Sequence, residues 1–154
     1  MKKIIDVLQE VMEGGFEQAG YDKKFGFVTV SNRPDLCQYQ CNGAMAAAKQ
    51  YKMAPFQIAE KVVEAVKEND IFEKIEMVKP GFINITVSGK LLVDFGKAMM
   101  TEEKFGIPAP EKERTVVIDY GGANVAKPLH VGHLRPAIIG ESVKRIMRFK
   151  GNDV

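Results

Sequence analysis

One stretch near the C-terminal end limits the possible folds most strongly, because it joins a short β-branched run to a long amphipathic helix. Thr115–Tyr120 is a continuous apolar run of the kind found in buried parallel strands. Gly121-Gly122 interrupts it, and apolar residues at helical spacing follow from about Val131 to Lys150, before Gly151. A parallel strand reaches its neighbour through a crossover of a dozen or more residues. We therefore expect a strand, a loop and a crossover helix, with a second strand beginning at 152–154.

The residues before this stretch predict a separate α+β unit. Helices are expected at 3–13, ending at Gly14-Gly15, at about 42–50 behind an Asn42 cap, and from Pro55 onward. Strands are expected at Phe25–Val30, Ile71–Val78 and Phe82–Val87, with a turn at Ser31–Asp35. A helix at Leu91–Glu103 and a linker at 106–110 then connect the two units. The expected division is 1–88, 89–113 and 114–154.

Composition restricts the class of protein. Apolar residues make up 45% and charged residues 27%, a balance typical of a globular protein that is not embedded in a membrane. The longest apolar stretch, Ala44–Ala48, is too short to span a bilayer, and Asp6 and Glu10 interrupt any signal-peptide core. The cysteines, Cys37 and Cys41, favour reduced thiols in a cytoplasmic protein over a disulfide framework.

The net charge of +2 is unevenly distributed. Residues 127–150 contain six basic side chains and the single acid Glu141, so the remaining chain is net acidic. A basic segment suits a polyanion such as ATP or RNA, although a solvated helix face is the simpler interpretation of charge alone.

Two histidines stand where the expected strand gives way to the helix. His130 and His133 flank Gly132 at a predicted helix start, where free N–H groups and the positive end of the helix dipole favour phosphate. Imidazoles donate hydrogen bonds to phosphate oxygens, and glycine lets a ligand approach the backbone closely. Positioning and charge stabilisation are the main requirements of adenylyl transfer. The pattern therefore indicates a nucleotide site.

The segment from Asp119 to Arg135 resembles the His-x-Gly-His signature of class I aminoacyl-tRNA synthetases. The longer run Asn-x-Ala-Lys-Pro-x-His-Val-Gly-His-Leu-Arg is similar to that of the arginyl-tRNA synthetases. Two further segments, 35–45 and 79–86, resemble the appended N-terminal domain of that family. Together these matches extend over nearly the whole chain.

The resemblance implies an α+β N-terminal domain followed by the first β-α segment of a truncated Rossmann-like α/β catalytic domain. It implies an arginine–tRNA ligase with ATP and Mg²⁺, L-arginine and tRNA(Arg) as substrates and partners. Arginine's carboxylate would attack the α-phosphate, forming arginyl-adenylate before transfer to tRNA. The resemblance implies a cytoplasmic location. It also leads us to expect no protein-bound metal, no membrane association and no DNA partner.

The resemblance also assigns roles to individual residues. The catalytic pair would be His130 and His133, and ATP would be bound by Lys127, His130, Gly132 and His133. Arginine would be bound by Asp119, Gly122, Ala123, Asn124 and His133. The D-loop of tRNA would contact the segment Arg33–Gln40, with Gln38 and Tyr39 as the tRNA-binding candidates.

The chain departs from the family pattern at three points. Gly121-Gly122-Ala123 replaces the more usual Ser-Ser-Pro, which predicts a more flexible loop. Pro136 replaces a serine or threonine in what we expect to be the first helical turn. The second signature, similar to Lys-Met-Ser-Lys, the anticodon-binding domain and most guanidinium contacts are missing, so we expect the chain alone to be inactive.

Alternatives remain at each site. The chain could be only a tRNA-binding module, or an unrelated nucleotidyltransferase with the same histidine motif. The histidines could be polar helix-start residues, or zinc ligands together with Cys37 and Cys41, although the spacing suits zinc poorly. Asp119 could simply accept backbone hydrogen bonds at a strand end, and Gln38 and Tyr39 could be ordinary surface residues.

Overall fold

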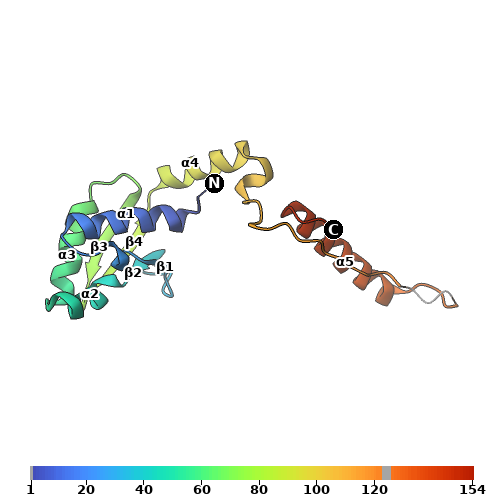
Figure 1. Cartoon of the computed structure of the whole chain (residues 1–154), viewed down its shortest axis with the longest axis horizontal. Helices are drawn as coiled ribbons and strands as arrows, with labels where there is room; N and C mark the ends of the chain where they lie inside the picture. Colours follow the sequence, from blue (N-terminus) through green and yellow to red (C-terminus); the bar gives the residue numbers. More distant parts are fainter. Residues whose placement is uncertain (1, 123–125) are drawn as a thin grey trace. The chain divides into compact units, whose positions relative to one another are not determined.

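The structure, a computed structural model, describes residues 2–122 and 126–154 and divides into two units, Lys2–Met99 and Met100–Val154 (Figure 1). The division falls inside helix α4, Gly89–Thr101. The chain is a mixed α/β protein, as the sequence predicts.

A four-stranded antiparallel sheet forms the centre of the first unit. Its strands, in chain order, are β1 (Val28–Val30), β2 (Tyr39–Cys41), β3 (Phe72–Val78) and β4 (Phe82–Val87). Their order in the sheet is β1-β2-β4-β3. One row of directly paired residues crosses all four strands and consists of Thr29, Gln40, Asn84 and Glu76.

Three helices pack on one face of this sheet. They are α1 (Ile4–Gln18), α2 (Gly43–Tyr51) and α3 (Pro55–Val66), and a 3-10 turn, η1 (Lys23–Phe25), follows α1 (Figure 1). Alternate residues of a strand point to opposite faces, so Ile83 and Ile85 enter the core while Asn84 points away from it. The largest fully buried side chains are Phe16, Leu8, Met12, Ile58, Ile83, Ile85, Val28, Val62 and Cys41.

Helix α1 does not end at Gly14-Gly15, and that expectation was wrong. The helix continues to Gln18 because Gly15 lies at the crossing with α3, where a Cβ atom would overlap Cγ1 of Val66. The next residue, Phe16, is completely buried. Close helix packing therefore outweighs the low helix propensity of two successive glycines.

The first strand is shorter than the sequence predicts. Phe25 belongs to η1, where Asp22 accepts a hydrogen bond from the Lys24 backbone N–H, and the strand begins only at Val28. Strand β2 was not predicted, because Tyr39–Cys41 lies in a short polar segment without an apolar run. The helix from Pro55 and the strands ending at Val78 and Val87 are confirmed, the first of these two strands beginning at Phe72 instead of Ile71.

The second unit contains a 3-10 turn, η2 (Glu103–Gly106), and the long helix α5 (Val131–Phe149). The helix agrees with its expected bounds within one residue, and Gly151 has a φ of 92°, a left-handed conformation that suits glycine after a helix end.

The expected strand Thr115–Tyr120 is reduced to a single parallel bridge between Thr115 and Asp153. The Val116 N–H donates to the Asp153 carbonyl at 2.7 Å, and the Asp153 N–H donates to the Arg114 carbonyl at 3.1 Å. The prediction of a strand through 120 was wrong, because among the described residues only Asp153 pairs with this segment. The bridge joins the two ends of the crossover, as a Rossmann-like start requires.

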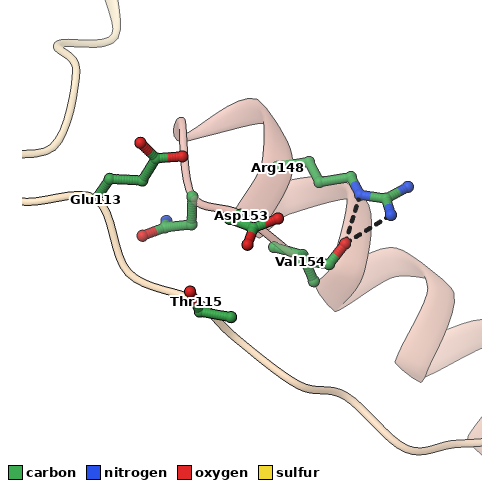
Figure 2. A pocket seen from close by; sticks show the side chains of 6 residues that line it. Glu113, Thr115, Arg148, Asp153 and Val154 are labelled. Atoms are coloured by element: carbon green, nitrogen blue, oxygen red, sulfur yellow. Dashed lines mark hydrogen bonds between the residues drawn. The ribbon is translucent and has the colours of Figure 1, made fainter.

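A cavity of about 640 Å³ lies beside this bridge (Figure 2). Glu113 and Thr115 line one side, and Arg148, Asp153 and Val154 line the other. The guanidinium of Arg148 donates from Nε and Nη2 to the Val154 carbonyl at 3.1 and 2.6 Å. Arg148 therefore holds the residues after α5 close to the helix that precedes them.

The apolar stripe of α5 is exposed within its own unit. Leu134, Ile138 and Ile146 are each more than half exposed, and Gly140 is the only buried residue that the structure describes in this helix. The amphipathic pattern that predicts this helix therefore does not correspond to a formed core here.

Candidate active site at the start of helix α5

The two histidines cap the start of α5 reciprocally. His130 is the N-cap residue, with an extended backbone (φ −140°, ψ 172°), and its Nδ1 accepts the Gly132 N–H at 3.1 Å. The His130 N–H in turn donates to Nδ1 of His133, also at 3.1 Å. This is the geometry of a capping box, with imidazoles in place of the usual hydroxyl and carboxylate.

The capping bonds determine which ring nitrogens can face a ligand. Because Nδ1 accepts a hydrogen bond in both rings, a neutral imidazole carries its proton on Nε2. The ring centroids are 4.0 Å apart and tilted by 50°. His130 and His133 therefore present two closely spaced N–H donors beside a helix N-terminus, which suits an oxyanion such as phosphate.

An open cavity of about 510 Å³ lies at this pair. The residues that line it are Gly121, Leu129, His130, Val131, His133, Leu134 and Ala137. Its wall combines apolar side chains with the two imidazoles, a composition typical of small-molecule sites. The structure therefore brings the histidine pair to the start of α5, beside an accessible cavity.

Gly132 is required by this arrangement. A Cβ atom at residue 132 would lie 2.8 Å from Cε1 and 2.9 Å from Nδ1 of His130. Any side chain would displace the ring that caps the helix, so the glycine between the histidines has a steric reason.

The other candidate ligands of the loop are not gathered as closely. Asp119, Gly122 and Lys127 are exposed, and none of these three is among the residues that line the cavity. Ala123 and Asn124, expected to bind arginine, lie outside the described residues.

A polar cluster that the sequence analysis missed holds the end of the extended segment on α5. The Tyr120 hydroxyl donates to Oε2 of Glu141, and Nζ of Lys144 lies 3.1 Å from that hydroxyl and 2.8 Å from the same carboxylate oxygen. Nε of Arg145 donates to Oε1 of Glu141 at 2.9 Å. Hydrogen bonds from Lys144, Tyr120 and Arg145 lower the pKa of Glu141 from 4.5 to about 2. The sequence contained only the i,i+3 and i,i+4 charge spacing as a signal.

Pro136 does not lie in the first turn of the helix, and that expectation was wrong. The helix begins at Val131, so Pro136 is its sixth residue and lies inside it. Proline has no N–H to donate to the carbonyl four residues earlier, which belongs to Gly132. The second turn of α5 therefore lacks one hydrogen bond, directly beneath the histidine cap.

The tRNA-binding candidates of the first unit have structural contacts. Oε1 of Gln38 accepts the Val87 N–H at 2.9 Å, and Tyr39 packs partly against the core. Tyr39 is the first residue of β2, and Gln38 lies in the bend just before it. Beside Gln38, Nε2 of Gln40 donates to Oδ1 of Asn84 at 2.9 Å on the sheet face away from the helices.

Neither cysteine shows signs of reactivity. Cys37 and Cys41 are free and buried, and burial raises the pKa of the Cys41 thiol to about 11. Among residues 2–122 and 126–154, no group of three or more histidine, cysteine or acidic side chains is placed to hold a metal ion. Within the same residues, no helix combines the length and apolar character that crossing a membrane requires.

Two family models match this chain in succession. Residues 1–87 match the arginyl tRNA synthetase N terminal domain, and residues 95–154 match the catalytic domain of class I (R) tRNA synthetases. The first match alone covers more than half of the chain.

Curated relatives and solved structures agree with these matches. The arginine–tRNA ligase of Alkaliphilus oremlandii is 57% identical over 154 residues, which are 100% of this chain and 26% of that protein. That of Agathobacter rectalis is 54% identical, again over 100% of this chain and 26% of that protein. The crystal structure of arginyl-tRNA synthetase from Plasmodium falciparum covers 99% of this chain and 30% of its own, with a TM-score of 0.61 and 26% identity.

The arginyl-tRNA synthetase of Thermus thermophilus is similar in fold, with a TM-score of 0.53 at 22% identity, over 99% of this chain and 24% of its own. The present chain spans about a quarter of the length of the curated relatives that it matches. The chain belongs to the arginyl-tRNA synthetase family.

Proposed function

We propose that this chain provides the first part of an enzyme that joins L-arginine to tRNA(Arg) with ATP, through an arginyl-adenylate. The observation that carries the proposal is the reciprocal capping of α5 by His130 and His133, which directs two Nε2–H donors away from the backbone. Donors held in advance by other bonds need no reorganisation when charge develops on a phosphate, which is the main source of electrostatic catalysis.

The residues of the site then have distinct roles. The imidazoles of His130 and His133 donate to oxygens of the α-phosphate as arginine's carboxylate attacks it and pyrophosphate leaves with Mg²⁺. The N-terminus of α5 adds the positive end of its dipole, and Gly132 lets the nucleotide approach the helix. Lys127 adds a positive charge on the phosphate side, and Asp119 pairs with the α-ammonium group of arginine.

We further propose that the 154 residues alone do not charge tRNA. Support comes from the length of the relatives, of which this chain matches only 26%. A family model for the catalytic domain matches only residues 95–154. The apolar face of α5 is also exposed within its own unit, so the walls of a closed nucleotide site are not assembled there.

A chimera tests the proposed activity directly. The matching quarter of the Alkaliphilus oremlandii ligase would be replaced by this chain, which is 57% identical to it. We expect arginine-dependent charging of tRNA(Arg) by the chimera and none by the chain alone. Replacing His130 or His133 by alanine should lower kcat about 100-fold, the usual effect of removing one oxyanion donor. Lys112→Gln, an exposed change in the linker, is the control.

Full charging by a chimera carrying both histidine substitutions would contradict the proposed role of the pair. Charging by the chain alone would contradict the proposal that it is inactive.

We also propose that the first unit contacts tRNA, a second function favoured by the sheet face away from α1, α2 and α3. This face carries Gln40, which is half-buried and hydrogen-bonded to the buried Asn84, and Phe27, just before β1, is 61% exposed. Amides hydrogen-bond to base edges, and aromatic rings stack on unpaired bases. A cavity of about 250 Å³ is lined in part by Phe27, Thr29 and Asn42 at one edge of this face.

A titration of the whole chain with tRNA(Arg) at two salt concentrations tests this contact. Gln38→Ala, Gln40→Ala and Phe27→Ser should each weaken binding, whereas Glu64→Gln on helix α3 should not. Phosphate-driven binding weakens steeply with salt, while stacking persists, so the loss in the Phe27 variant should remain at the higher salt. Equal binding by all four variants would contradict a contact through the sheet.

A further inference from the structure

The extended segment before the histidine motif is attached to α5 at two places. At one end, Thr115 forms the parallel bridge with Asp153. At the other end, the ring of Tyr120 lies against Gly140, the only buried residue described in α5. A Cβ atom at residue 140 would overlap Cβ, Cγ and Cδ1 of Tyr120, so this seat exists only because residue 140 is glycine.

The hydroxyl of Tyr120 adds a second attachment at the same place. It donates to Glu141, and Nζ of Lys144 lies 3.1 Å from the hydroxyl oxygen and 5.8 Å from the centroid of the ring. Glu141 and Lys144 are each only about one third exposed, so this ion pair is more sheltered than a typical surface pair. The ring is thus held by shape and its hydroxyl by charge-assisted hydrogen bonds.

The attached residue lies directly beside the imidazole cavity. Gly121, the next residue, has a φ of 85° and lines that cavity together with His130 and His133. Ala137 lines this cavity and also the neighbouring one at Tyr120 and Glu141. Tyr120, which packs against α5, is therefore followed directly by a residue that lines the candidate site.

We infer that Tyr120 is a positioning residue of the candidate nucleotide site, whose ring against Gly140 and whose hydroxyl on Glu141 and Lys144 hold the loop at Gly121 against the imidazole pair. The inference rests on the proposed function of that site. Tyr120 acts through the neighbouring Gly121. Moving the ring out of its seat releases the loop and changes the surroundings of both imidazoles.

The histidine signals of the chain report on this directly, because His130 and His133 are its only two histidines. The imidazole Cε1–H resonances of the whole chain would be recorded without nucleotide. They would be compared among variants that change either Tyr120 or Gly140, the two residues in contact. Tyr120→Leu removes the ring and its hydroxyl, and Gly140→Ala fills the space that the ring occupies. We expect both variants to shift the two histidine signals in the same direction.

Two further variants separate positioning from general destabilisation. Tyr120→Phe retains the ring and loses the hydroxyl, so it should produce a smaller shift in the same direction. Arg145→Gln removes the cation that donates to Oε1 of Glu141, whereas Tyr120 donates to Oε2 of the same carboxylate. This variant should leave the histidine signals unchanged. Amide signals of Lys2–Met99 should stay in place in all four variants, because the substitutions lie outside the first unit.

Histidine signals of Tyr120→Leu and Gly140→Ala that superimpose on those of the unchanged chain would overturn the inference. So would equal shifts in Arg145→Gln and Tyr120→Phe, since the effect would then come from Glu141 alone. These outcomes are independent of arginine activation, which tests the proposed function in the chimera.

Discussion

The backbone nitrogen of His130 and Nδ1 of His133 are 3.1 Å apart, and the N–H between them completes a capping box made of two imidazoles. A histidine at each capping position satisfies backbone donors at the start of α5 and at the same time orients both rings. The stability of the first turn of α5 and the orientation of both rings are therefore coupled, because a change that frees the rings also frays the helix.

Replacing Gly132 by alanine should break this coupling. The new Cβ would lie 2.8 Å from the His130 ring, which must leave its capping position. We expect α5 to lose about 1 kcal/mol of stability, as other N-caps do, and the Gly132 amide proton to exchange faster with solvent. Hydrogen exchange followed by NMR measures both effects. Slow exchange at residue 132 in this variant would contradict the capping role of His130.

Two adjacent glycines in α1 should respond to alanine in opposite ways. Nothing lies within 4 Å of a Cβ at Gly14, so Gly14→Ala should stabilise the unit by about 0.5–1 kcal/mol through helix propensity. At Gly15 the Cβ would overlap Val66, so Gly15→Ala should destabilise it by about 1–3 kcal/mol. Urea unfolding of the two variants provides the comparison. Similar midpoints for both would show that α1 and α3 do not pack this closely.

Restoring the missing N–H of α5 should stabilise its second turn. Pro136→Ser allows a hydrogen bond to the Gly132 carbonyl and removes the ring clash, which together cost up to about 3 kcal/mol in helix interiors. We expect slower amide exchange in the first half of α5. Pro108→Ser in the linker should change nothing in the helix. Unchanged exchange in the Pro136 variant would mean that the turn tolerates proline without loss.

The Glu141 cluster should make the attachment of Tyr120 sensitive to acid. The pKa of Glu141 is about 2 in the folded chain and about 4.5 ordinarily, so its contribution is complete above pH 4.5 and is lost as pH falls to about 2. The side-chain carboxyl carbon of Glu141 and the ring protons of Tyr120 should titrate together near pH 2. Glu141→Gln should remove this transition, and a carboxyl midpoint near 4.5 would contradict the cluster.

Periodicity predicted the elements whose own residues form their contacts. Helices α3 and α5 and the hairpin β3–β4 agree closely with expectation, since their apolar spacing, Pro55 and Gly151 are local signals. The errors come from contacts distant in sequence. Gly15 fits against Val66, and strand β2 exists because Tyr39 and Cys41 pair with Ile85 and Ile83.

The position of the candidate site was predictable from the sequence, but the contacts that hold its residues in place were not. The His-x-Gly-His spacing indicated a helix start, and the structure places both rings there beside a cavity, while phosphate binding at that start stays a prediction. No sequence pattern indicated that the rings cap the helix through Nδ1, or that Tyr120 lies on Gly140. Both depend on where the chain folds back along α5, which a single sequence does not reveal. The ligand-binding and catalytic roles of all the candidate site residues, the two histidines included, stay predictions.

Long-range ¹H–¹⁵N correlation spectra of the two histidines, recorded with and without ATP, test the central claim most directly. The structure requires Nδ1 of both rings to accept backbone hydrogen bonds, so both neutral rings should show the Nε2–H tautomer, and ATP should shift both Nε2 signals. An Nδ1–H tautomer in either ring, or Nε2 signals unmoved by ATP in the charging-competent chimera, would contradict a triphosphate site built on this pair.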